Sequence, residues 1–213
     1  MWITVFGAAG QVGSRVVSEG LSRGHQVTAV VRDPARLGEL HPDAEHRTGD
    51  AADVGEVVEL SAGRDLVVSA TRPGLGREQE LVVTARAQLA AAAKTGVRLL
   101  IVGGAASLTV PGGDGRSVLD EPAFLPAEHR PIALACVAQF AAVCADTNAD
   151  WTYLSPPALL EPGTRTGRYR LGADELLVDA DGGSWISMED LAVALLDEAE
   201  QPRHRRARFT VAH

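Results

Sequence analysis

The feature that most constrains this chain is a set of three glycines, Gly7, Gly10 and Gly13, spaced three residues apart. They follow directly on residues 2–6, an apolar run typical of a buried strand, and a stretch with helical periodicity comes next. Glycine is needed where a backbone turns tightly, where a helix packs close to a strand, and where a phosphate group approaches the free N–H groups of a helix. The pattern predicts a dinucleotide-binding turn, and a tight turn without a ligand is the alternative. The predicted contacts are Gly7, Ala9, Gly10, Gln11, Val12 and Gly13.

The alternation of strand and helix continues beyond this turn. Runs of β-branched residues that are apolar on both faces, such as residues 26–31, are typical of strands buried in a parallel sheet. The predicted strands are 2–6, 26–31, 45–48, 65–70, 98–103, 151–155 and 209–211, and the predicted helices are 11–22, 34–37, 53–60, 77–94, 128–147 and 188–200. This order predicts an α/β fold of Rossmann type, with a doubly wound parallel sheet and helices on both faces.

The chain length of 213 residues favours a single domain, residues 1–213. We predict that residues 1–155 form the cofactor-binding core, that about 156–187 form a small turn-rich lobe on the substrate side, and that 188–213 form a final helix and strand. Glycine and proline are frequent in residues 108–127 without a clear period, which predicts a loop over the sheet.

The composition argues against several kinds of partner. A formal net charge of −8 does not suit nucleic acid, and no apolar stretch is long enough to span a membrane. No charged leader precedes the first strand, so we expect a cytoplasmic protein. Cys136 and Cys144 are expected to be reduced and semi-buried, without a metal or redox role, and we expect no metal site. Whether the protein is a monomer or a homodimer stays open.

The end of the second predicted strand indicates which dinucleotide is bound. An acidic side chain there favours NAD by bonding the ribose 2′-hydroxyl, whereas an arginine favours the 2′-phosphate of NADP. The sequence has Arg32 at this position, followed by Asp33, which we expect to cap the next helix. We therefore predict NADP, with NAD possible and a solvated surface Arg32 as the alternative. Arg15, in the first turn of the first helix, is either a further contact or an exposed helix residue.

Other cofactor contacts are predicted from their position at the carboxyl ends of strands, where ligands of open α/β sheets bind. They are Asp50 and Ala51 after the third strand, Ser69, Ala70 and Thr71 after the fourth, and Gly103 and Gly104 after the fifth.

Several of these segments together resemble the atypical short-chain dehydrogenase/reductases. They are the glycine turn, residues 31–34 (Val-Arg-Asp-Pro), 49–50 (Gly-Asp) and 102–107 (Val-Gly-Gly-Ala-Ala-Ser), and the likeness continues through 151–157, 163–169 and 186–192. The chain is similar to the NAD(P)H-binding, NmrA-like and biliverdin-reductase-B-like (flavin reductase) branch. The resemblance implies a Rossmann fold and a nicotinamide cofactor, and it is poor in information about the substrate.

The chain lacks the catalytic pair that is typical of this superfamily. Those enzymes use Tyr-x-x-x-Lys, in which the lysine lowers the tyrosine pKa so that the tyrosine exchanges a proton with the substrate. Here neither Tyr153 nor Tyr169 has a lysine four residues later, because Lys94 is the only lysine. Carbonyl–alcohol chemistry by the usual route is therefore excluded.

Two residues are candidates to replace the pair. The resemblance places Ser107 beside the nicotinamide, where its hydroxyl can donate a hydrogen bond; alternatively it satisfies the loop backbone. His129, near the start of the helix that carries the tyrosine in the superfamily, can donate a proton because the pKa of histidine lies near neutrality. The alternative for His129 is a surface histidine at a helix N-terminus. Tyr153 lies inside a predicted strand, so we expect it in the core or in a pocket wall.

The likeness to biliverdin-reductase-B-like enzymes implies chemistry that needs no tyrosine, because a flavin or tetrapyrrole accepts a hydride readily and takes its proton from solvent. Acceptors of that kind need orientation more than acid catalysis. We expect an NADPH-dependent reductase of a small planar conjugated acceptor, a flavin or quinone, seated among Pro156, Pro157 and residues 108–127. An NmrA-like redox-sensing regulator that binds NADP(H) without turnover is the alternative, and an epimerase or dehydratase-like enzyme is a weaker one.

Overall fold

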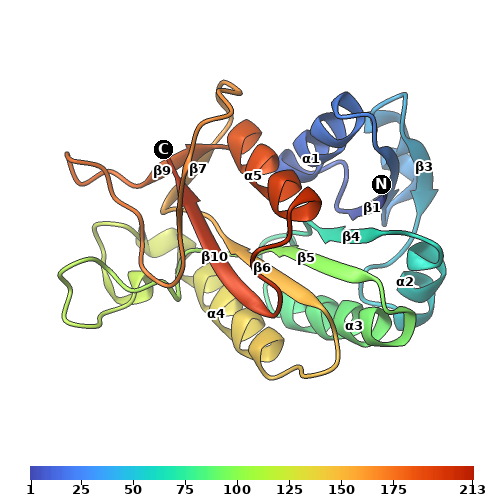
Figure 1. The fold of residues 1–213 in the computed structure, drawn as a ribbon. Helices are drawn as coiled ribbons and strands as arrows, with labels where there is room; N and C mark the ends of the chain where they lie inside the picture. Colours follow the sequence, from blue (N-terminus) through green and yellow to red (C-terminus); the bar gives the residue numbers. More distant parts are fainter.

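The computed structural model describes all 213 residues, and its centre is one sheet of eight strands (Figure 1). The strand order is β3-β2-β1-β4-β5-β6-β10-β8, and all neighbours are parallel except β8, which pairs antiparallel with β10. The strands are β1 (Trp2–Phe6), β2 (Gln26–Val31), β3 (Glu45–Thr48), β4 (Leu66–Ser69), β5 (Arg98–Val102), β6 (Trp151–Ser155), β8 (Arg170–Gly172) and β10 (Ala207–Ala212). The order reverses between β1 and β4, so the predicted doubly wound Rossmann-type sheet is confirmed.

Helices cover both faces of the sheet (Figure 1). On one face lie α1 (Gln11–Ser22) and α5 (Met188–Glu200), which pack against each other. On the other lie α2 (Val54–Ser61), α3 (Glu80–Thr95) and α4 (Arg130–Cys144). None of these helices combines the length and apolarity that a membrane span requires.

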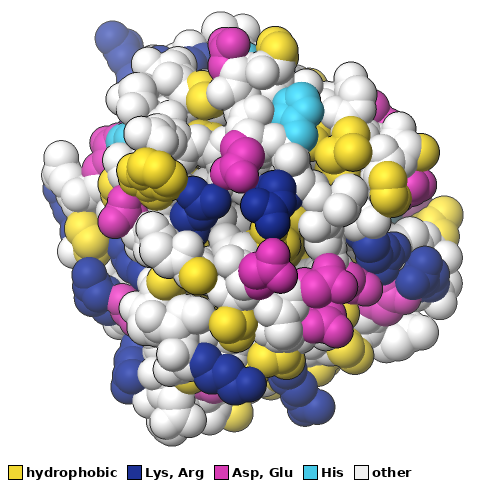
Figure 2. All heavy atoms as spheres, turned by 90° about the vertical axis from the view of Figure 1, so that its right-hand side faces the viewer, with side chains coloured by type: hydrophobic (Ala, Val, Ile, Leu, Met, Phe, Trp, Pro, Cys, Tyr) yellow, Lys and Arg dark blue, Asp and Glu magenta, His cyan; other side chains and the backbone are white.

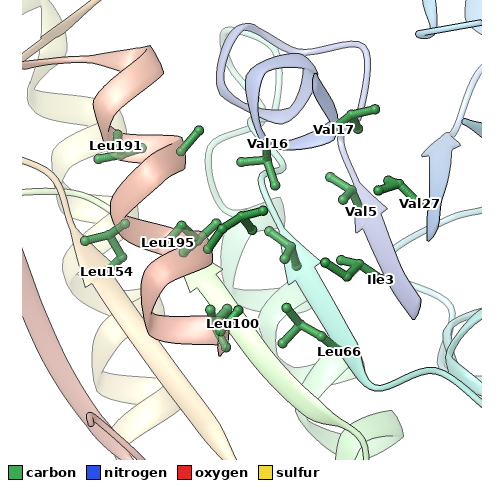
Figure 3. Packing of buried hydrophobic residues seen from close by; sticks show 14 of the residues in the cluster. Ile3, Val5, Val16, Val17, Val27, Leu66, Leu100, Leu154, Leu191 and Leu195 are labelled. Carbon is green, nitrogen blue, oxygen red and sulfur yellow. The ribbon is translucent and has the colours of Figure 1, made fainter. Parts of the chain in front are cut away.

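Alternate side chains along each strand point to opposite faces of the sheet and so belong to two separate hydrophobic cores. Val5 of β1 points toward α1 and α5, and Figure 3 shows it beside Val27 of β2 and below Val17 of α1. Thr4, the residue before it, faces the opposite side and donates its hydroxyl to the carbonyl of Leu60 in α2, at 2.8 Å. Because both faces are buried, the strands show the apolar runs noted in the sequence.

The edge strand β3 is protected by charge. Arg47 pairs with Glu45 of the same strand and with Glu59 of α2, and Arg64 also reaches Glu45. Figure 2 shows basic and acidic side chains mixed on this side of the molecule, rather than gathered by sign. Such mixed charge discourages edge-to-edge pairing with another chain.

Short elements complete the chain after β6. A two-stranded parallel sheet joins β7 (Leu159–Glu161) and β9 (Trp185–Ser187), while β8 extends the main sheet through β10. Three 3-10 helices lie in loops: η1 (Pro34–Glu39), η2 (Val118–Asp120) and η3 (Ala127–His129).

Two of the longer predicted helices have wrong boundaries. The helix expected from residue 77 begins at Glu80, because Gly76 has a φ of +79° and turns the chain just before it. The helix expected over 128–147 covers only α4, since a 3-10 turn precedes it and Asp146 ends it. The Asp146 carboxylate accepts N–H bonds from the two residues at 148–149, a local turn that competes with the helix.

Candidate cofactor-binding cleft

The glycine turn is so tightly folded that it leaves no room for side chains. Gly7 has a φ of +79°, and a Cβ there would lie 2.5 Å from the carbonyl oxygen of Ala70. A Cβ on Gly13 would lie 2.1 Å from the carbonyl oxygen of Gly7, so α1 packs directly on the turn. Gly10 closes the turn by donating its N–H to Gly7 at 2.9 Å. The predicted need for glycine at these positions therefore has a steric cause.

The first N–H groups of α1 are left for a ligand. The backbone N–H groups of Gln11, Val12 and Gly13 have no acceptor in the protein, and Ser14 is the first helical residue with one, the Gly10 carbonyl at 3.0 Å. These free donors and the helix dipole concentrate positive charge at this end. The cradle therefore fits a phosphate group of a dinucleotide.

A cleft of about 330 Å³ opens beside the turn, along the carboxyl ends of β1, β2, β3 and β4. The predicted cofactor residues that line it are Gly7, Ala9, Arg32, Asp50, Ala51 and Thr71. The other turn residues lie beside the cleft rather than in its wall. Ser69 is buried at the end of β4, with its hydroxyl 3.5 Å from that of Thr71.

Arg32 stands at the mouth of this cleft. Its side chain is 54% exposed and makes one long ion pair, 3.4 Å, with Glu80. The neighbouring acid Asp33 is engaged in the predicted cap of η1, where it accepts the N–H of Ala35 at 2.9 Å. Arg32 is therefore less engaged in contacts within the protein than Asp33.

Sequence reasoning missed two further arginines that line the cleft, Arg36 and Arg72. Arg36 donates its Nη2 to the carbonyl of Ala9 at 2.9 Å and pairs with Glu39, so it ties η1 to the glycine turn. Arg36 lies in η1, whose start is marked in the sequence by Asp33 and Pro34, just after Arg32 at the end of β2. Arg72 lies in the loop after β4, is exposed, and forms no ion pair; no motif marks it.

Arg15 lies outside the cleft. Its Nε pairs with Glu189 at 2.6 Å, and its Nη1 donates to the carbonyl of Gln11 at 2.7 Å. Neither expectation, a cofactor contact or a free surface residue, describes this side chain. It links α1 to α5.

Beyond the cleft, Tyr153 shapes the backbone that follows β5. The Tyr153 hydroxyl donates to Gln139 at 3.0 Å and accepts the N–H of Gly104 at 3.3 Å. A Cβ on Gly103 would lie 1.9 Å from the tyrosine ring, so only glycine fits there. Burial raises the pKa of Tyr153 far above its ordinary value. As expected, this tyrosine belongs to the core and is no acid.

The two catalytic candidates lie in different surroundings. Ser107 is half-buried, and its hydroxyl accepts a hydrogen bond of 2.8 Å from Nη1 of Arg208, a partner that sequence reasoning missed. His129 is exposed at the start of α4, and its ring makes no hydrogen bond. No hydrogen bond joins the two residues.

Comparisons with known proteins place this arrangement among nicotinamide-binding folds. A family model described as NAD(P)H-binding matches residues 7–202. A solved structure from Burkholderia pseudomallei, provisionally described as an exported protein, is 38% identical with a TM-score of 0.88, covering 100% of both chains. One from Bacteroides thetaiotaomicron, provisionally an epimerase, is 37% identical with a TM-score of 0.89, covering 100% of this chain and 96% of that one. One from Streptococcus pneumoniae, provisionally an NADH-flavin reductase, is 28% identical with a TM-score of 0.87, covering 100% and 99%.

Proposed function

The chain belongs to the NAD(P)H-binding family of atypical short-chain dehydrogenase/reductases, and on that premise we propose that it is an NADPH-dependent reductase of a planar conjugated acceptor, a flavin or a quinone. The observation that carries this proposal is a well-formed cofactor cleft without the acid–base pair of the superfamily. Tyr153 is locked in the core, and Lys94 is exposed at the end of α3, far along the chain from any tyrosine. The likeness to the Streptococcus pneumoniae protein supports the same class of reaction.

The preference for NADP rests on the guanidinium groups of the cleft. Arg32, Arg36 and Arg72 line it together, and a 2′-phosphate is the part of NADP that NAD lacks. The cleft also holds Asp33 and Asp50, but each carboxylate already accepts a backbone N–H, at 2.9 Å in both cases. The arginines are therefore the side chains best placed to hold a further anion.

The residues of the chain hold and orient the reactants. A bound nicotinamide would supply a hydride, which an acceptor of this class would take up together with one proton from water. The N–H groups at the start of α1 hold the pyrophosphate, and the arginines hold the ribose phosphate. Gly103 and Gly104 keep the backbone after β5 free of side chains, and Ser107 orients the acceptor by a hydrogen bond.

The test measures NADPH oxidation with a panel of flavins and quinones, and the reaction is monitored by the loss of NADPH absorbance. We expect turnover with at least one acceptor, above the rate of a Gly13→Ala variant, in which the added methyl group collides with the carbonyl of Gly7 and displaces the glycine turn. NADPH binding, measured by calorimetric titration, without turnover of any acceptor would contradict the proposal.

That contrary result would favour a second candidate, an NmrA-type regulator that binds NADP(H) without chemistry. The specific observation in its favour is that His129 is exposed and unpartnered, so that no proton donor is assembled beside Ser107. An epimerase-type activity has the description of the Bacteroides thetaiotaomicron structure in its favour, yet it lacks the tyrosine chemistry in the same way.

A further inference from the structure

One buried cation, Arg208, lies outside the cofactor cleft. It occupies β10, where Phe209 and Val211 face the core under α1 and α5, so the alternation of the strand turns Arg208 toward α4. Its side chain is only 7% exposed. The centre of the guanidinium lies 4.4 Å from the ring centroid of Phe140, which is a cation–π contact.

Hydrogen bonds hold this guanidinium on two further sides. Nη1 donates to the hydroxyl of Ser107 at 2.8 Å and to the carbonyl of the same residue at 3.2 Å. Nε and Nη2 both donate to one carboxylate oxygen of Asp174, at 2.9 and 2.5 Å. Arg208 therefore ties the loop after β5 to the segment after β8.

The chemistry of the guanidinium decides the direction of the bond to Ser107. An arginine side chain has donors only and stays protonated in proteins. The Ser107 oxygen must therefore accept, and its own O–H proton points elsewhere. No acceptor in the chain takes that proton, so the hydroxyl of Ser107 is a donor available to a ligand.

The same face of the sheet carries more polar groups toward its carboxyl edge. Thr210, two residues after Arg208, lies in register with Ser155, and both side chains are buried. Neither hydroxyl has a hydrogen-bond partner, and a buried hydroxyl without one is unfavourable. The side chains of β6 and β10 that face α4 here are polar, whereas the opposite face of the sheet is filled by apolar side chains. This part of the sheet therefore suits polar contacts rather than packing alone.

We propose that Arg208 is a positioning residue that directs the Ser107 O–H toward the bound acceptor. The inference rests on the proposed reductase function. The Ser107 hydroxyl donates to the carbonyl oxygen or ring nitrogen on which the acceptor gathers negative charge during reduction, and the cation behind it strengthens that donor. This arrangement selects acceptors that, like flavins and quinones, carry such an atom next to the position of hydride uptake.

A double-mutant cycle tests the inference with Ser107→Ala, Arg208→Met and the double variant. Two quantities are measured: the dissociation constant of FMN or menadione in the presence of NADP⁺, and kcat/KM for NADPH oxidation. We expect each single change to weaken acceptor binding and kcat/KM by about tenfold, the loss of one charge-backed hydrogen bond. The double variant should lose no more than Ser107→Ala alone, because Arg208 acts through Ser107.

Arg205→Met is the matched control. Arg205 lies shortly before β10 and pairs with Asp150 at the surface, so the variant removes a nearby arginine without touching Ser107. Its acceptor binding and turnover should equal those of the wild type. If Arg208→Met does not fold, Arg208→Lys replaces it, since lysine keeps the charge but its single ammonium cannot reproduce the four hydrogen bonds of the guanidinium; a partial loss is then expected.

Losses that multiply in the double variant would overturn the inference, because Arg208 would then act on the fold alone. A crystal structure with NADP⁺ in which the Ser107 Oγ lies beyond roughly 8 Å from the nicotinamide ring, more than one stacking distance and one hydrogen bond, would overturn it as well. If the mutant cycle shows the expected non-additivity in acceptor binding but the wild type does not reduce the acceptor, only the reductase function is contradicted. A wild type that binds neither acceptor class contradicts both.

Discussion

Removing Arg32 or Arg36 is expected to weaken the binding of NADPH far more than that of NADH. Both side chains line the cleft where β2 ends, and only NADP carries the 2′-phosphate that they are placed to hold. The variants are Arg32→Ala, Arg36→Ala and the double variant, and the decisive quantity is the ratio of the two dissociation constants.

The expected magnitude follows from exposure and from existing partners. A hydrogen bond to a charged group contributes about 1.5–3 kcal/mol. The two side chains are 54% and 46% exposed, so solvent screening reduces the contribution to about 1–2 kcal/mol each. That corresponds to roughly 5- to 30-fold in the dissociation constant. Arg32 should show the larger loss, because Arg36 is already engaged by Glu39 and by the carbonyl of Ala9.

Calorimetric titration with NADPH and with NADH at one fixed ionic strength measures the ratio. Arg36→Ala should also weaken NADH slightly, by about 1 kcal/mol at most, because it removes a bond to the glycine turn. Arg47→Ala is the control, since Arg47 is an exposed arginine of β3 outside the cleft. Equal losses for the two dinucleotides, or none for either, would refute the assignment of the 2′-phosphate to these arginines.

Three further changes test other parts of the structure. Gly13→Ala should abolish dinucleotide binding, because its Cβ would lie 2.1 Å from a turn carbonyl, whereas Gly38→Ala meets nothing within 4 Å and should bind normally in the same titration. Glu198→Gln should lower the free energy of unfolding by about 3 kcal/mol in urea denaturation, since it leaves the buried guanidinium of Arg98 without its carboxylate; a loss below about 1 kcal/mol would contradict this. Burial alone would raise the pKa of Asp190, but hydrogen bonds from a threonine hydroxyl and two backbone N–H groups hold it below its ordinary value. The resulting stability is present above the ordinary aspartate pKa and is lost as the pH falls through the lower folded pKa, so Asp190→Asn should flatten the acid side of the stability–pH curve.

The regular elements of the sheet were predictable because their signals are local. Strands such as β2 are apolar on both faces, and the glycine turn marks the start of α1. The start of α3 was misplaced because the preceding turn depends on the left-handed Gly76 rather than on helical periodicity. The pairing of β8 with β10 had no local signal, since it joins segments that approach only after folding.

The two halves of the candidate site differ in the same way. The cofactor half is local: the glycine turn and Arg32 lie within the first strand–helix–strand unit, and Arg36 follows four residues after Arg32, in η1. The acceptor half is not. Ser107 was predicted from the resemblance, but its partner Arg208 lies 101 residues further along the chain, and no spacing in the sequence connects them.

This difference decides which part of the site tolerates changes in sequence. The cofactor half is rigid, because the glycines admit no side chain and the turn packs on α1, so most changes there destroy binding. In the proposed acceptor half, Arg208 contacts Ser107, Phe140 and Asp174, which come from three other segments of the chain. A change in one loop is therefore expected to alter the proposed acceptor site without disturbing the dinucleotide site. It follows that variants of Ser107 and Arg208 should leave the dissociation constant of NADPH unchanged, and a parallel loss of NADPH affinity would show that the two halves are energetically coupled.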